Sequence, residues 1–124
     1  MLRFAPLALL ALAGAAGAVP PANPYNDALR RLSPLMQRSV LRRAILDDKN
    51  GCGRVVSAVW RGPYRNLQRW EAQCDRGGAY AIFVGTDQSV QVRDCPSLAA
   101  LKLPPCAPLP KPDAAPAKAL KPHA

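Results

Sequence analysis

Cysteines are the residues of this 124-residue chain with the widest range of chemistry, because a thiolate can ligate a metal, attack a substrate or form a disulfide. The four are Cys52, Cys74, Cys95 and Cys106. None belongs to a closely spaced CxxC pair, and the only histidine is His123 near the C-terminus. Zinc sites typically use such pairs, and a catalytic thiol is normally activated by a histidine. The pattern therefore favours two disulfides, for which three connectivities exist.

The acidic residues are the other candidates for catalysis, and their positions favour structural roles. Most are expected at helix ends or in turns, where carboxylates act as caps and turn formers: Asp27, Asp47, Asp48, Asp75, Asp87 and Asp94. Only Glu71 is expected in the middle of a strand, and an ion pair with Arg69 on the same face would explain it. The sequence has no glycine-rich phosphate-binding loop. We therefore expect no enzyme, no cofactor and no bound metal.

The first 18 residues have the pattern of a secretory signal peptide. Arg3 precedes a run rich in alanine and leucine, and this run ends at the small residues Ala16-Gly17-Ala18. Prolines and glycines interrupt the run, which disfavours the alternative of an uncleaved membrane anchor. We expect cleavage after Ala18, no membrane span in the mature chain, and a periplasmic or secreted protein in which disulfides are stable.

Residues 51–95 carry the signal of a four-stranded antiparallel meander. Four short runs rich in β-branched and aromatic residues are separated by Gly-Pro, Arg-Gly-Gly and Gly-Thr-Asp-Gln, which are turn signals. Pairing the first two runs about Pro63 places Cys52 opposite Cys74 and Val56 opposite Trp70, with both tryptophans on the core face. This register favours a Cys52–Cys74 disulfide, and the remaining two cysteines would then pair with each other.

The turn between the second and third runs can close in two registers, which direct opposite faces of the third run toward the core. A two-residue loop would turn one set inward, namely Ala79, Ala81 and Phe83. A three-residue loop over 76–78 would turn the other set inward, namely Tyr80, Ile82 and Val84. The longer loop fills the core face better and offers a glycine for the left-handed position, so we expect it. It leaves Phe83 on the outer face.

Two helical segments precede the sheet. Asn26 is expected to cap a short helix that runs through Leu32, and Ser33-Pro34 to begin a second helix that ends at about Asp48. Asn50-Gly51 would end this helix with glycine in a left-handed cap. At 100° per residue one side of the second helix is apolar and should lie on the sheet, namely Met36, Val40, Leu41, Ala44 and Ile45.

These elements predict an α+β domain with two layers, in which a helix kinked or broken near Pro34 packs on a disulfide-stapled meander. We divide the chain into a signal peptide (1–18), a linker (19–25), the α+β domain (26–106) and a tail (107–124). The tail is rich in Pro, Ala and Lys and has almost no large apolar residue, so we expect it to be disordered.

Two arginine-bearing surfaces are candidate sites for a partner. One is the outer sheet face, with Arg61, Arg69 and Arg93 around Phe83; the other is a helix row of Arg31, Arg38 and Arg42. The chain has 17 basic and 8 acidic residues and a formal net charge of +9, which favours acidic partners or anionic surfaces. An exported protein seldom meets nucleic acid, so we do not expect that partner. A solvated charged face that confers solubility is the simpler alternative for both surfaces.

The segment Cys52…Trp70-Glu-Ala-Gln-Cys74-Asp-Arg-Gly-Gly-Ala-Tyr80 resembles small, uncharacterised exported proteins of Gram-negative bacteria. These share a cysteine, a strand, and a second cysteine followed by a glycine-containing turn and a tyrosine strand; the resemblance covers about residues 52–92. The order of helix and meander also resembles PepSY-type periplasmic modules. The resemblance implies a binding or accessory role. We therefore expect a monomeric exported module that binds a protein partner, with a binder of polyanions or of anionic envelope components as the alternative.

The signal-peptide assignment predicts the amino terminus of the mature protein. Mass spectrometry of exported material should find Val19 as the first residue, because signal peptidase cleaves after a small-x-small motif such as 16–18. A mature protein that retains Leu7 to Ala13 would refute cleavage and support a membrane anchor.

Overall fold

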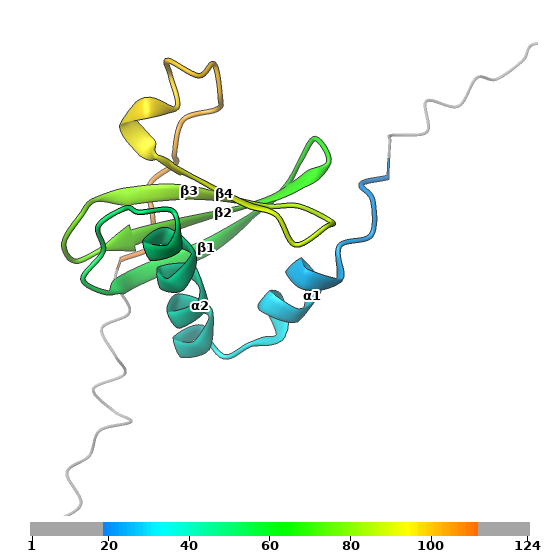
Figure 1. Cartoon of the computed structure of the whole chain (residues 1–124), viewed down its shortest axis with the longest axis horizontal. Coiled ribbons are helices and arrows are strands. Elements are labelled where there is room, and N and C mark those ends of the chain that lie inside the picture. Colours follow the sequence, from blue (N-terminus) through cyan, green and yellow to red (C-terminus); the bar gives the residue numbers. More distant parts are fainter. Residues whose placement is uncertain (1–18, 112–124) are drawn as a thin grey trace, which may run out of the picture.

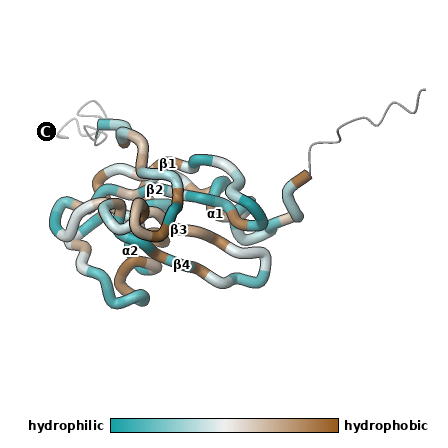
Figure 2. The backbone as a smooth tube through the Cα atoms, turned by 90° about the horizontal axis from the view of Figure 1, so that it is seen from above, coloured by the Kyte–Doolittle hydropathy of each residue, from teal (hydrophilic) through white to brown (hydrophobic). Residues whose placement is uncertain are grey.

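The structure, a computed structural model, describes residues 19–111 and has the α+β class that the sequence predicts. Its elements are α1 (Pro24–Arg31), α2 (Pro34–Asp47), β1 (Val55–Tyr64), β2 (Leu67–Cys74), β3 (Ala79–Val84), β4 (Val90–Asp94) and the short 3-10 helix η1 (Cys95–Ser97). The strands form one antiparallel sheet in the order β1-β2-β3-β4, as Figure 2 shows from above. In Figure 1, α2 lies in front of this sheet. The predicted signal peptide and the tail beyond residue 111 lie outside the described residues.

The first helix begins earlier than the sequence predicts. Asn23 is its N-cap: the side-chain Oδ1 accepts the backbone N–H of Asn26 at 3.0 Å, and Pro24 follows in the first turn. Asn26, the predicted cap, is instead buried inside the helix, where its Oδ1 accepts the indole N–H of Trp70 at 2.7 Å. The predicted linker 19–25 is therefore shorter, because Asn23, Pro24 and Tyr25 belong to the domain.

The second helix is capped as predicted and ends differently. The Ser33 hydroxyl accepts the N–H of Met36 at 3.3 Å, which separates α1 from α2 at the predicted break. At the other end Lys49 adopts the left-handed conformation (φ 60°), so the prediction that Gly51 takes this role is wrong. The turn closes through the backbone N–H of Asn50, which donates to the carbonyl of Ile45 at 3.1 Å.

The main hydrophobic core lies between the helices and one face of the sheet. Leu41 and Ile45 of α2 are buried there, as predicted, and Ala44 packs against the same cluster. Met36 and Val40, which were expected to lie on the sheet, are exposed instead. The sheet contributes Val55, Trp70, Ala72, Tyr80, Ile82, Val84 and Val92. The prediction that Tyr80, Ile82 and Val84 of β3 point inward is thus confirmed. The loop before β3 spans residues 75–77 and not 76–78, because the N–H of Cys74 donates to the carbonyl of Gly78.

The predicted register of β1 and β2 is wrong, but both tryptophans keep their predicted face. A bulge between Val55 and Ser57 places Val55 in the core instead of the predicted Val56. The turn lies at residues 65–66, and Trp70 pairs with Trp60 in place of Val56. Gly62 (φ 97°) lies at a bulge between Trp60 and the turn, so the Gly-Pro signal marks a bulge and not the hairpin turn. Because the shift is an even number of residues, both tryptophans remain on the helix-covered face. The Cys52–Cys74 disulfide forms as predicted, with a Cα–Cα distance of 5.4 Å.

The second face of the sheet is covered by the chain that follows β4. Figure 1 shows this segment, in yellow and orange, passing behind the sheet. Leu98 packs there on Phe83 and Ala81, and the predicted Cys95–Cys106 disulfide ties the segment together. Phe83 is only 3% exposed, so its predicted place on an open face is wrong. The segment continues along the sheet to Pro110, whose carbonyl accepts the Ser57 hydroxyl at 2.7 Å, so the predicted disorder does not begin at Ala107.

Burial on both faces predicts similar costs for truncation on either side. Trp70→Ala and Phe83→Ala should each lower the free energy of unfolding by about 3–5 kcal/mol, because each removes a buried aromatic ring. Trp70→Ala also leaves the buried Asn26 side chain without its donor. Chemical denaturation of the oxidised protein measures both, with Leu101→Ala, which is 49% exposed in wild type, as the control. Wild-type stability of Phe83→Ala would contradict a covered second face.

Candidate functional site

The arginines predicted on the outer sheet face are engaged within the domain. Arg61 Nε lies 3.2 Å from Oε1 of Glu71, and Arg69 Nη2 lies 3.6 Å from Oε2 of the same carboxylate. The expected ion pair between Arg69 and Glu71 is thus present. Glu71 is almost fully buried and Arg69 is 5% exposed, so these groups cannot form an open partner surface.

The same cluster holds the segment after β4 against the sheet. Arg69 Nη1 donates to the carbonyl of Pro104 at 2.8 Å, and Arg61 Nη2 donates to the carbonyl of Pro108 at 2.9 Å. The backbone N–H of Ala107 donates to Oε1 of Glu71 at 2.9 Å. We call residues 103–110 the strap. Of the predicted outer-face residues, Arg61 and Arg69 bind the strap and Phe83 packs against it, whereas Arg93 is exposed.

The helix row of arginines does not form one continuous surface. Arg31 is exposed at the end of α1, and Arg38 is half-buried beside a hollow whose other lining residues include Pro110 and Lys111. Arg42 Nε donates to the carbonyl of Gly53 at 2.8 Å and so connects α2 to the chain before β1. A further arginine, Arg30, stacks on the ring of Trp60 at 3.6 Å from its centroid.

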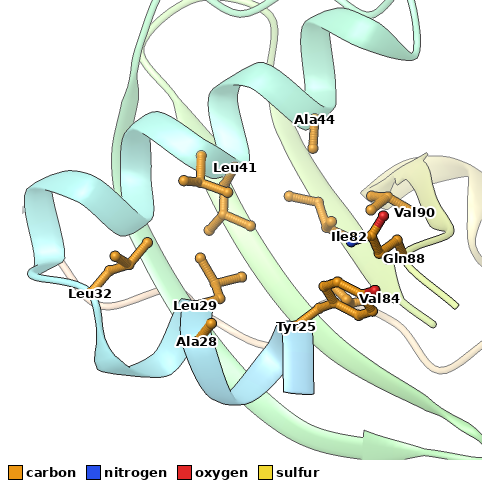
Figure 3. A pocket seen from close by; sticks show the side chains of 11 residues that line it. Tyr25, Ala28, Leu29, Leu32, Leu41, Ala44, Ile82, Val84, Gln88 and Val90 are labelled. Atoms are coloured by element: carbon orange, nitrogen blue, oxygen red, sulfur yellow. The ribbon is translucent and has the colours of Figure 1, made fainter. Parts of the chain in front are cut away.

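An apolar groove lies between the helices and the β3–β4 end of the sheet. It has a volume of about 330 Å³ and is lined by Tyr25, Ala28, Leu29, Leu32, Val40, Leu41, Ala44, Ile82, Val84, Gln88 and Val90. In Figure 3 the side chains of α1 and α2 face those of Ile82, Val84 and Val90 across the groove. All lining side chains except Gln88 are aliphatic or aromatic, so the groove suits an apolar group.

The groove extends along the seam between α2 and β4. A second hollow shares Val40, Ala44 and Val90 with the groove and is also lined by Arg43, Asp47 and Asp48. Val40 is 43% exposed and Val90 is 44% exposed, so both apolar walls of this seam are in contact with solvent. We refer to the groove and this hollow together as the seam groove.

The sequence pattern predicts one wall of the seam groove as core and gives no sign of the other. Val40 was assigned to the face that lies on the sheet, and Tyr25 to the linker. The width of the apolar stripe on α2 is a sequence signal for exposed apolar surface. The stripe includes Leu35 and Met36, which are exposed, in addition to the residues that the core buries. A stripe wider than the core requires leaves apolar side chains at the surface.

The two carboxyl groups with shifted pKa values, Asp75 and Asp87, accept hydrogen bonds that stabilise turns. The backbone N–H of Arg54, which donates to Asp75, holds the pKa of this carboxyl below its ordinary value. The Ser89 hydroxyl and backbone N–H similarly lower the pKa of Asp87. Both carboxylates lie in turns beside strands. Within residues 19–111, no three side chains of His, Cys, Asp or Glu come together as a metal site would require.

No helix within the described part of the chain is long and apolar enough to cross a bilayer.

Comparison with known proteins yields no relative: no family model matches the chain, and no curated protein or solved structure matches it. Evidence for a function must then come from the structure itself, and the seam groove is the exposed apolar site that it offers.

The strap cluster predicts a large cost for removing its central charge. Glu71→Gln should destabilise the domain by about 3–5 kcal/mol, because it leaves the buried Arg69 guanidinium without its carboxylate. Tryptic cleavage after Lys102 should also become faster as the strap loosens. The matched control is Asp47→Asn, which breaks an exposed ion pair with Arg43 and should cost less than about 0.5 kcal/mol. Equal unfolding curves for the two variants would show that the cluster does not hold the strap.

Proposed function

We propose that this protein is an exported, non-catalytic module that binds a protein partner through the seam groove. The single observation that carries the proposal is the open apolar groove of about 330 Å³ in a domain whose sheet is otherwise covered on both faces. Apolar surface that stays in contact with water stabilises nothing in the free domain, and contiguous apolar surface of this kind typically marks an interaction site.

The two disulfides also support an exported binding role. Both cysteine pairs form disulfides, and such bonds persist mainly outside the cytoplasm, in the periplasm or in secreted proteins. The disulfides also stabilise a small domain that would otherwise have little free energy of unfolding to spare. A stapled domain of this size can therefore leave an apolar groove open and remain folded.

The alternative, a binder of polyanions or anionic envelope components, is less well supported. The outer-face arginines Arg61 and Arg69 bind the strap, and Arg42 binds a carbonyl group. The formal charge of +9 still favours non-specific contact with anionic surfaces. Retention on heparin or anionic vesicles that disappears at moderate salt would be the signature of this alternative.

Site-specific photo-crosslinking tests the proposed function. A photoreactive phenylalanine analogue at Val40 or at Val90 should crosslink one defined protein in the cells that export this domain, since both side chains line the groove. The same analogue at Leu101, an equally exposed apolar position outside the groove, is the matched control. Val40→Asp should weaken binding of the captured protein at least tenfold, because burying a valine contributes roughly 1.5–3 kcal/mol.

Equal crosslinking from Leu101 and Val40, or full binding by Val40→Asp, would refute the seam groove as the site. Crosslinks to lipid or polysaccharide that vanish at moderate salt would instead support the alternative.

A further inference from the structure

The edge strand β4 presents unpaired backbone groups beside the seam groove. β4 is the last strand in the order β1-β2-β3-β4, so one of its edges has no neighbouring strand in the described chain. Gly85 N–H donates to the carbonyl of Ser89 at 2.8 Å, which sets the phase of the β3–β4 ladder. In an antiparallel ladder alternate residues bond to the partner strand, so Val90 and Val92 direct their N–H and C=O groups to the free edge.

One contact at this edge agrees with that phase. Arg93 Nη1 donates weakly to the carbonyl of Val92 at 3.4 Å, which places this carbonyl outside the ladder. Within residues 19–111, it is the only hydrogen bond that the outward groups of Val90 and Val92 make. A strand that lies along β4 can therefore form regular backbone hydrogen bonds.

The helix-facing side of such an added strand would lie at the seam groove. Val90 lines the groove and Val92 belongs to the core cluster, so both side chains point to the helix side of β4. Residues opposite them on an added strand point to the same side. Every second side chain of that strand would thus meet Val40 and Ala44 of α2, and an apolar side chain fits there.

The opposite side of β4 favours an acidic residue. Arg93 alternates with Val92 and points to the other face, where it is exposed. It has no acidic partner within residues 19–111. A carboxylate directly across from Arg93 on an added strand would supply one. A second copy of the chain is a poor occupant, since it carries the same strongly basic charge.

We propose that β4 and the seam groove bind an extended peptide segment of the partner as a fifth strand, with apolar residues at alternate positions and an acidic residue opposite Arg93. Strand addition of this kind takes affinity from backbone hydrogen bonds and specificity from alternate side chains. The proposal rests on the proposed function, since it specifies what the same groove binds.

The test uses the full-length oxidised protein and a capped peptide of alternating valine and glutamate as the probe. Amide hydrogen exchange of Val90 and Val92 should slow at least about tenfold when the peptide binds, because their N–H groups become hydrogen-bonded. A peptide that is N-methylated at every second residue along one edge should bind at least about tenfold more weakly. Val40→Asp should weaken binding, and Leu101→Asp should not.

A charge exchange tests the acidic position. Arg93→Glu should lower the affinity for the valine–glutamate peptide by about two- to fivefold and raise the affinity for a valine–lysine peptide. A merely structural role of Arg93 would change both affinities in the same direction.

Three results would overturn the proposal. Loss of binding in Val40→Asp without protection of Val90 and Val92 would leave the groove as a binding site but exclude strand addition. If the peptide does not bind while the crosslinked partner still does, strand addition is likewise excluded and the groove remains a binding site. Protection of Val90 and Val92 that rises with protein concentration in the absence of peptide would show that a second copy is the occupant.

Discussion

Two buried asparagines on α1 determine the position of this helix, and through it the shape of the groove. Asn26 accepts the indole N–H of Trp70 at 2.7 Å, and Asn23 Nδ2 donates to the carbonyl of Val84 at 3.1 Å. Leu29 is the only apolar side chain that α1 buries fully. The helix is therefore held to β2 and β3 largely by directional hydrogen bonds, which are strong when buried and costly to leave unmade. Because α1 buries Leu29 and little other apolar surface, Tyr25 and Ala28 remain available to line the groove.

Strand β2 connects this arrangement to the other side of the sheet. Its neighbouring residues Trp70 and Glu71 point in opposite directions, one into the helix-covered core and one into the strap cluster. Both are almost fully buried, so the strand is enclosed on both faces although the chain is short. The strap makes this possible, since it covers Phe83 and supplies four backbone groups as partners to Arg61, Arg69 and Glu71. The seam groove is thus the part of the helix-covered face that neither helix closes.

Sequence patterns predicted the fold well and the surfaces poorly, for physical reasons. Period-two alternation identified the core face of β3, and hairpin pairing identified the Cys52–Cys74 disulfide although the register was displaced. The even shift kept Trp60 and Trp70 on the predicted face, whereas the bulge at Val56 placed Val55 in the core. Pattern alone could not tell a bulge from a turn at Gly62, nor which of two nearby asparagines caps α1. The outer face was misjudged because Arg69 and Phe83 are covered by a Pro-rich strap without apolar periodicity. Such a segment is held by its carbonyl groups, and these are the same in every sequence.

Both disulfides lie toward one end of the sheet, and the seam groove lies toward the other. Cys52, Cys74 and Cys95 flank the β2–β3 loop and the end of β4, whereas Val84, Gln88 and Val90 border the turn between β3 and β4. Local opening reactions of a cross-linked domain concentrate where the chain is least constrained. The domain consequently has a graded rigidity along its strands, with a covalently fixed base and a more compliant tip. Sequence changes at the tip, including insertions between residues 85 and 89, can alter the width of the groove without disturbing either cross-link.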